Sequence, residues 1–181
     1  NIIDDLQKSP IMGLDTEFIR ESTYFPQLAL LQLSDKNNTY CIDILAITEN
    51  NLISDLLVSK KIKKIIHASK QDLEVLNHYY SCYPQNIFDT QIAYNLLTPD
   101  ISISYSNLVK KYINIELKEG SWRTDWLKRP ISDDKIEYAS NDVKYLIDLY
   151  EILNKELLDS NRIDWLDEEQ SMELKKSNIV A

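Results

Sequence analysis

The chain has 181 residues, of which 44% are hydrophobic and 27% charged, with only two glycines and five prolines. This composition excludes a disordered protein and is typical of one compact domain with a sizeable core. The net charge of −9, from 20 basic and 29 acidic residues, argues against a protein that coats nucleic acid through many lysine and arginine contacts to phosphate. An enzyme that holds a few nucleotides through bound metal ions is not excluded.

Two features of the sequence bear on the cellular location of the protein. No apolar run approaches the roughly 18 residues that a membrane span needs, so we expect no membrane partner. Cys41 and Cys82 are too few for a disulfide framework and lack the spacing of zinc ligands, which favours a reducing compartment and a cytoplasmic protein. Residue 1 is Asn rather than Met, so the lack of a signal peptide says little.

Hydrophobic periodicity and turn residues predict an alternation of strands and helices. The first half of the chain is expected to form a helix over 1–8, a strand from 11, a polar connection over 20–26, two strands over 27–33 and 39–44, a helix over 49–58 and a strand over 62–67. The second half is expected to form helices over 69–80, 89–97, 105–112, 132–158 and 162–176, with a short strand at 87–88 and an irregular stretch over 113–130.

No linker, repeat or low-complexity tract interrupts this pattern. We therefore expect a single domain over 1–181, with its core at about 10–160 and a C-terminal helix and tail at 161–181. Lysines at 60, 61, 63 and 64 surround the fourth strand. They are interpreted as a solvated edge or, alternatively, as contacts to phosphate.

Two carboxylates end the first strand, in the run IMGLDTEF over 11–18. Asp15 and Glu17 are two residues apart, so their side chains share one face of the strand, whereas Met12 and Leu14 point into the core. Neighbouring acids at the end of a buried strand repel one another unless a cation compensates. Open α/β sheets also place their ligands at the carboxyl ends of the strands. Two ordinary surface acids remain the alternative.

Two more acids lie at predicted helices. Asp72 stands in the first turn of the 69–80 helix, where Ser69-x-x-Asp72 also matches a capping box, so capping and metal ligation are both open. Asp142 lies one helical turn after Tyr138, on the same face. An acid on a face that leans toward the core needs a partner, either a metal ion or a hydrogen-bond donor. Asp89 also opens a helix, and N-capping explains it fully.

These residues, in this order, resemble the DEDD exonucleases: Asp-x-Glu on a first strand, an Asp at a helix start, and Tyr-x-x-x-Asp on a late helix. The Tyr138–Asp142 spacing is similar to that of the tyrosine subclass. The surrounding stretches LDTEFIRESTYFPQLALLQLS, HASKQDLEVL, FDTQIAYNLL and LKEGSWRTDWLKRPISDDKIEYASNDVKYL resemble the ribonuclease D family from about residue 11 to 153. Ser69 and Ser104 stand where that family often has glycine.

The resemblance implies an α/β, ribonuclease-H-like fold: a mixed sheet of three antiparallel strands followed by parallel strands, with helices on both faces. It implies a 3′–5′ exoribonuclease that acts on single-stranded RNA 3′ ends and releases 5′-mononucleotides, in tRNA or structured-RNA maturation or in RNA turnover. Family members carry helical nucleic-acid-binding domains after this one, so the chain is expected to be an excised catalytic domain or a stand-alone relative.

Phosphodiester hydrolysis suits two divalent ions about 3.5–4 Å apart, and Mg²⁺ or Mn²⁺ prefers carboxylate oxygens. We expect Asp15, Glu17, Asp72 and Asp142 to hold the two ions, with Asp15 as the bridge. Tyr138 is expected to orient the attacking water, because a phenol with a pKa near 10 is a poor base.

Substrate contacts are expected from residues around these acids. The resemblance implies that Glu17 also contacts the terminal 3′-hydroxyl. Candidates for binding the nucleotide or the incoming strand are Thr16, Phe18, His67, Arg123 and Arg129. Phe18 could instead belong to the core, His67 could support the site from behind, and Arg129 could be tied to a local acid.

Three alternatives stay open on the sequence alone. A DNA 3′–5′ exonuclease of the Werner type would use the same chemistry, and so would a nuclease that clears very short oligoribonucleotides; no residue identifies a contact to the 2′-hydroxyl. An inactive nucleic-acid-binding module is disfavoured, because such a protein should have lost an acid or the tyrosine. The sequence does not indicate an oligomeric state.

Overall fold

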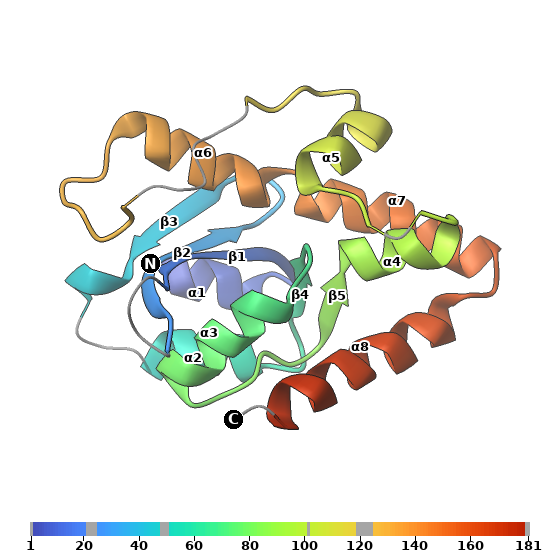
Figure 1. Cartoon of the computed structure of the whole chain (residues 1–181), viewed down its shortest axis with the longest axis horizontal. Helices are drawn as coiled ribbons and strands as arrows, with labels where there is room; N and C mark the ends of the chain where they lie inside the picture. The colour runs from blue at the N-terminus through green and yellow to red at the C-terminus, as the bar shows by residue number, and fades with distance from the viewer. Residues whose placement is uncertain (1, 21–24, 48–50, 101, 119–124, 180–181) are drawn as a thin grey trace.

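The computed structural model describes residues 2–20, 25–47, 51–100, 102–118 and 125–179 (Figure 1). Its mixed sheet has the strand order β3-β2-β1-β4-β5. The strands are β1 (Ile11–Ile19), β2 (Gln27–Ser34), β3 (Thr39–Asp43), β4 (Lys63–Ile66) and β5 (Ile87–Asp89). The helices are α1 (Ile2–Lys8), α2 (Asn51–Val58), α3 (Lys70–Tyr80), α4 (Thr90–Leu97), α5 (Tyr105–Ile113), α6 (Asp133–Lys144), α7 (Leu146–Asp159) and α8 (Ile163–Ile179), with a 3₁₀ turn η1 (Ile44–Ala46).

The sheet changes direction at its centre. β1, β2 and β3 are antiparallel neighbours. A short turn at 35–38 joins β2 to β3, in which Asp35 accepts hydrogen bonds from the backbone N–H groups of Asn37 and Asn38. β4 and β5 follow helices and run parallel to β1. The result is the mixed sheet with helices on both faces that the family resemblance implies, the arrangement expected of a ribonuclease-H-like fold.

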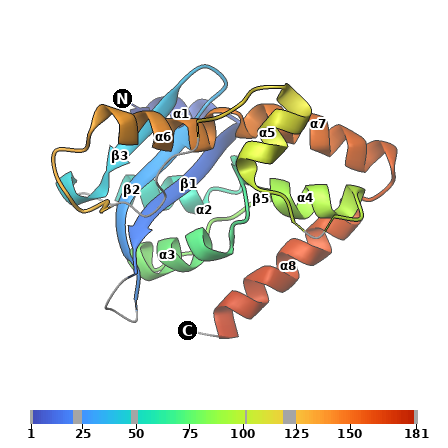
Figure 2. The same cartoon turned by 45° about the horizontal axis from the view of Figure 1, so that its top comes forward.

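Helices cover the two faces of the sheet separately (Figure 2). α1, α2 and α3 cover one face, and Met12 and Leu14 of β1 belong to the core cluster there. On the other face, α6 packs on β1, β2 and β3, and α7 packs on β1 and β4. The alternation along β1 therefore buries Met12 and Leu14 on the first side and turns Asp15 and Glu17 toward α6. No helix in the described part of the chain is long and apolar enough to cross a membrane.

β5 is the edge strand on one side of the sheet, and α8 lies along it (Figure 1). The side-chain amide of Gln170 on α8 donates to the Ile87 carbonyl at 3.1 Å and accepts from the Asp89 N–H at 2.7 Å. One carboxamide thus takes the place of a neighbouring strand along this part of the edge.

Two predictions about these elements are wrong. Lys64 is not part of a solvated edge: its side chain is fully buried, and its ammonium donates to the carbonyls of Ser59 and Ile62. Burial lowers the pKa of Lys64 to about 8. The single helix expected over 132–158 is two helices, because α6 ends at Lys144 and α7 begins at Leu146.

Candidate active site

The site lies where β1 and β4 separate. These two parallel strands pair only over Ile11–Gly13 and Lys63–Ile65, so the end of β1 that carries Asp15 and Glu17 has no strand beside it on that side. A cavity of about 940 Å³ opens there. This is the position beside the central strand, at the change of strand order, where open α/β sheets bind ligands. The pairing of β1 with β2 shifts register between Glu17 and Phe18, where Ala29 is the extra residue on β2; the sequence did not predict this shift.

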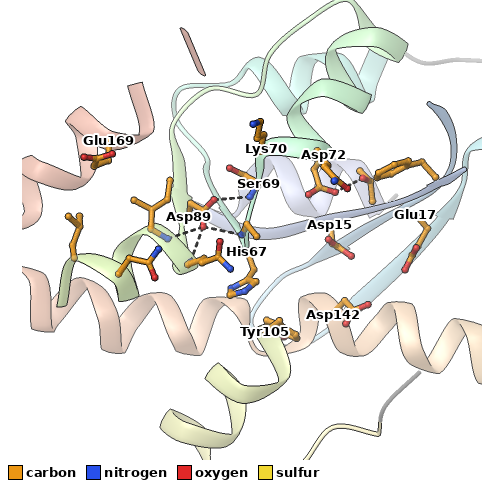
Figure 3. A pocket seen from close by; sticks show the side chains of 18 of the residues that line it. Asp15, Glu17, His67, Ser69, Lys70, Asp72, Asp89, Tyr105, Asp142 and Glu169 are labelled. Atoms are coloured by element: carbon orange, nitrogen blue, oxygen red, sulfur yellow. Dashed lines mark hydrogen bonds between the residues drawn. The ribbon is translucent and has the colours of Figure 1, made fainter. Parts of the chain in front are cut away.

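Three carboxylates from two distant segments converge in this cavity (Figure 3). Asp15 and Glu17 come from β1 and Asp142 from α6, and one oxygen of each lies within 4.8 Å of the others. Oxygen ligands at this spacing are the donor set that a hard divalent cation such as Mg²⁺ selects. The residues present therefore fit a divalent metal ion.

Asp72 enters the same cavity from the start of α3, and the structure bears on one of its two predicted roles, the capping box. The capping box with Ser69 does not form, because Ser69 makes no side-chain cap and its N–H donates to Asp89 at 2.8 Å. Asp72 instead accepts a hydrogen bond from the hydroxyl of Thr16 on β1. Thr16 is itself only 6% exposed. Its hydroxyl is therefore engaged in orienting Asp72, and the residue offers little surface to a substrate.

All four carboxyl groups are hard to ionise. Burial raises the pKa of Glu17 to about 8, with repulsion from Asp142 and Asp72 adding to it. Burial also raises the pKa of Asp72 to about 7 and that of Asp142 to about 7. Asp15 has a pKa well above its ordinary value, because of burial and then repulsion from the other three acids. A bound cation would offset both effects, because its positive charge stabilises the ionised carboxylates.

Tyr138 lies one turn before Asp142 on α6 and also lines the cavity. Its hydroxyl interacts electrostatically with the Asp142 carboxylate, as the shared helix face at i, i+4 predicts. Burial, and then the negative charges of Asp142, Glu17 and Asp15, raises the pKa of Tyr138 further above its ordinary value. The phenol therefore stays neutral at any physiological pH.

His67 and Phe18 also line the cavity. Phe18 also packs against the core cluster on the α3 side, as the structural alternative for this residue predicts. The ring of His67 is held on both nitrogens: Nδ1 lies 2.9 Å from the Thr90 hydroxyl and Nε2 lies 3.0 Å from the Ile103 carbonyl. Burial lowers its pKa, which favours a neutral imidazole that supports the wall of the cavity.

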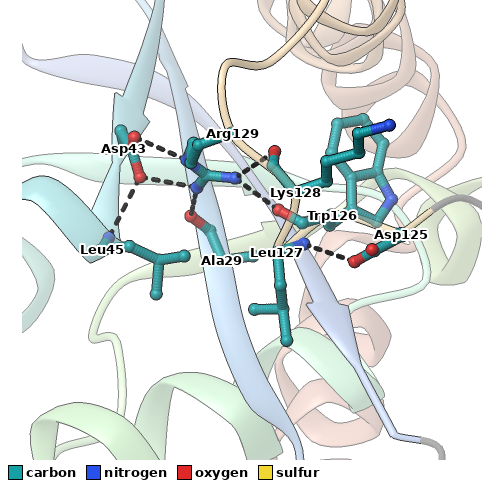
Figure 4. Close-up of polar contacts among 8 residues, drawn as sticks. All are labelled: Ala29, Asp43, Leu45, Asp125, Trp126, Leu127, Lys128 and Arg129. Atoms are coloured by element: carbon teal, nitrogen blue, oxygen red, sulfur yellow. Dashed lines mark hydrogen bonds and ion pairs between the residues drawn. The ribbon is translucent and has the colours of Figure 1, made fainter.

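Arg129 is not among the residues that line the cavity, and its polar contacts are shown in Figure 4. Its guanidinium donates to both carboxylate oxygens of Asp43, at 2.7 and 2.6 Å, and to the carbonyls of Ala29, Trp126 and Lys128. These contacts support the structural alternative for Arg129. The second basic candidate, Arg123, lies outside the described residues.

Sequence reasoning missed two residues that shape the site. Asp89 caps α4 as predicted, accepting from the N–H groups of Gln91 and Ile92, but it also binds the N–H groups of Ala68 and Ser69 before α3. Tyr105, read only as the start of a helix, lines the cavity beside His67. A tyrosine at a helix start gives no local signal of such a contact.

Comparison with known proteins agrees with this geometry. A family model described as 3′-5′ exonuclease matches residues 1–158, so the chain belongs to this exonuclease family. Ribonuclease D of Haemophilus influenzae is 43% identical over 151 residues, covering 83% of this chain and 38% of the relative. Ribonuclease D of Zymomonas mobilis is 42% identical over 166 residues, covering 91% of this chain and 43% of the relative.

The crystal structure of Escherichia coli RNase D, titled an exoribonuclease involved in structured RNA processing, superposes with a TM-score of 0.92 at 34% identity. The match covers 97% of this chain and 47% of that one. The expected ribonuclease-H-like fold and the resemblance to the ribonuclease D family are thereby confirmed. The chain spans less than half the length of these relatives.

Proposed function

We propose that this chain is the catalytic domain of a 3′–5′ exoribonuclease, which hydrolyses phosphodiester bonds at the 3′ ends of single-stranded RNA and releases 5′-mononucleotides. The observation that carries the proposal is the group of Asp15, Glu17 and Asp142, whose oxygens lie within 4.8 Å of one another in a cavity at the centre of the sheet. Membership of the 3′-5′ exonuclease family supports the direction of attack.

Four carboxylates would hold two divalent ions, Mg²⁺ or Mn²⁺: Asp15, Glu17, Asp72 and Asp142. Such ions acidify a bound water, neutralise phosphate charge and stabilise the leaving oxygen. The protein would contribute the placement of these ligands: the alternation of β1 sets Asp15 beside Glu17, and the Thr16 hydroxyl donates a hydrogen bond to Asp72.

Tyr138 would hold the attacking water rather than remove its proton. Its raised pKa keeps the hydroxyl protonated, and a neutral phenol can donate one hydrogen bond while its oxygen accepts another. With its proton directed at Asp142, the phenol oxygen can accept a hydrogen bond from a water beside the acids.

The substrate is proposed to be the 3′ end of RNA in tRNA or structured-RNA maturation, or in RNA turnover. Glu17 would contact the terminal 3′-hydroxyl, and Thr16, Phe18 and His67, which line the cavity, would enclose the last nucleotide. The net charge of −9 suits an enzyme that grips few phosphates, because bound cations reverse the local sign of the site. Two free thiols, Cys41 and Cys82, favour a reducing, cytoplasmic environment.

The test is a degradation assay with 5′-labelled single-stranded RNA, with and without Mg²⁺ or Mn²⁺, alongside Asp15→Asn. We expect a ladder of products that shorten one nucleotide at a time from the 3′ end, only with metal and only with the unsubstituted protein. Absence of shortening with either metal would refute the proposal. Faster loss of matched DNA, or activity confined to dinucleotides, would instead favour one of the alternative nucleases.

A further inference from the structure

The helix that carries Asp142 breaks shortly after it. α6 ends at Lys144 and α7 begins at Leu146, with Tyr145 between them at φ −107° and ψ 3°. Neither proline nor glycine occurs at the break, so the usual residue-level causes of an interrupted helix do not apply. A side chain inserted into the ladder of backbone hydrogen bonds is the other common cause.

That side chain is Tyr105, the first residue of α5. Its hydroxyl donates to the Asn141 carbonyl at 3.0 Å and accepts from the Tyr145 N–H at 3.1 Å. In an uninterrupted helix these two backbone groups, four residues apart, would bond to each other. The Tyr105 hydroxyl therefore takes the place of one helical hydrogen bond and keeps both groups paired.

A second side chain donates to the Val143 carbonyl, which also accepts from the Tyr145 N–H at the end of α6. The hydroxyl of Ser34, the last residue of β2, donates to the Val143 carbonyl at 2.8 Å. Gly13 of β1 makes room for this approach, because a Cβ at that position would lie 2.3 Å from Ser34 Oγ and 3.0 Å from the Val143 oxygen. The break is thus pressed against β1 and β2 at a point where β1 has no side chain.

The two anchored carbonyls belong to the residues on either side of Asp142, namely Asn141 and Val143. Tyr105 is itself fixed: Ser104 caps its helix by accepting from the Asn107 N–H at 3.3 Å, and the His67 ring packs edge-on against the tyrosine ring, 5.8 Å between centroids. The backbone of Asp142 is therefore held from both sides by elements that do not belong to its own helix.

We propose that Tyr105 and Ser34 are positioning residues that hold the α6–α7 break open so that the Asp142 carboxylate meets those of Asp15 and Glu17. The inference rests on the proposed function, since it assigns these hydroxyls a part in building the metal site. Without the Tyr105 hydroxyl, the Asn141 carbonyl either loses its partner, leaving the Tyr145 N–H to the Val143 carbonyl alone, or takes the Tyr145 N–H and straightens the helix. In both cases the backbone of Asp142 shifts.

The experiment compares Tyr105→Phe with Tyr112→Phe. Both changes remove one phenol hydroxyl from α5, but that of Tyr112 donates to Glu156 at 3.2 Å, away from the break. Mn²⁺ is titrated against each protein, with the rise in Tm as the readout, and RNA degradation is then measured over the same Mn²⁺ range. For Tyr105→Phe we expect Mn²⁺ binding at least about 10-fold weaker, the size of effect seen when a group that orients a metal ligand is lost. Activity should return at high Mn²⁺.

Tyr112→Phe should leave the half-saturating Mn²⁺ concentration unchanged, even if its Tm without metal falls. A merely structural role of Tyr105 would likewise lower the metal-free Tm and leave Mn²⁺ binding as it is, and that result would overturn the inference. If Tyr105→Phe does not fold, Ser34→Ala provides the same test from the other side of the break, and unchanged Mn²⁺ binding in that variant would overturn the inference equally. An unsubstituted protein that binds no Mn²⁺ would refute the proposed function itself, and the inference with it.

Discussion

Acidic side chains surround the hydroxyl of Tyr138, and their negative charges determine its protonation state and thus its possible chemical role. Its raised pKa follows from burial and from the charges of Asp142, Glu17 and Asp15. The ring lies beside Trp126, with 6.2 Å between centroids, so it has little freedom to move. A rigid phenol that keeps its proton is suited to holding a water in place rather than to general-base catalysis.

We expect Tyr138→Phe to lower kcat by about 10- to 100-fold, within the range that orientation of one group contributes. The ring remains in place, so Mn²⁺ binding measured by the rise in Tm should not change. Steady-state kinetics on single-stranded RNA supplies kcat. Normal turnover in this variant would remove Tyr138 from the proposed chemistry.

The four carboxyl groups make metal-free stability depend on pH. Their folded pKa values, about 8 for Glu17 and about 7 for Asp72 and Asp142, lie above those of an unfolded chain. The folded state therefore binds more protons than the unfolded state between about pH 4 and 8, and its stability is lost as the pH rises through this window. Bound Mg²⁺ or Mn²⁺ should remove this loss.

We expect the Tm of metal-free protein to fall from pH 5 to pH 8.5 and Mn²⁺ binding to tighten over the same range, because the metal displaces protons. Asp142→Asn should flatten the Tm profile and stabilise the metal-free protein by about 1–3 kcal/mol at pH 8, since it removes a buried charge. Thermal melts with and without chelator measure both effects. A Tm profile as steep as that of the unsubstituted protein would show that Asp142 is not part of the coupled group.

Residue periodicity was enough to predict which acids share a face. Alternation along a strand pairs Asp15 with Glu17, and the helical repeat pairs Tyr138 with Asp142. The role of Asp72 could not be predicted in this way, because its partner Thr16 is 56 residues away in sequence and because Asp89, from a different strand, occupies the N–H that a capping box would use.

Arg129 acts on the segment that leads into α6. It ties the Trp126 and Lys128 carbonyls of this segment to Asp43 at the end of β3 and to the Ala29 carbonyl of β2. The planar guanidinium supplies several donors in fixed directions, which a lysine ammonium cannot reproduce. Asp43 keeps a pKa below its ordinary value, chiefly because of this hydrogen-bonded pairing.

We expect Arg129→Met to lower the free energy of unfolding by about 2 kcal/mol, since several hydrogen bonds are lost at once, without raising KM for RNA. Urea unfolding and steady-state kinetics measure the two quantities. Arg129→Lys is the matched control. It keeps the positive charge but loses the planar guanidinium with its several N–H donors, so its free energy of unfolding should also fall. If KM instead rises in the methionine variant and not in the lysine variant, Arg129 contacts phosphate.

Most helices and strands could be predicted from periodicity and turn residues, but the break between α6 and α7 could not. The α6–α7 break depends on a hydroxyl 36 residues before Asn141, and nothing in the local sequence of 132–158 marks it. The exposure of Lys64 was predicted wrongly for a different reason, because its acceptor carbonyls, those of Ser59 and Ile62, are close in sequence. Neighbouring lysines indicate a solvated strand, whereas the carbonyls that accept its ammonium are known only from the fold.

Across the whole molecule, the order of elements along the chain was predictable, and the order of strands in space, β3-β2-β1-β4-β5, was not. That spatial order places β1 between an antiparallel half and a parallel half of the sheet. It is therefore the fold that brings residues 15, 17, 72 and 142 to one cavity, since these acids come from a central strand and from helices on opposite faces.

The Gln170 contact with β5 has a consequence for self-association. An unprotected edge strand offers its N–H and C=O groups to any other extended chain and can seed aggregation. Here the Ile87 carbonyl and the Asp89 N–H are already occupied by a carboxamide from the same molecule. A second copy that sought to lengthen the sheet past β5 would first have to displace α8, so this border of the sheet resists polymerisation while the molecule stays folded.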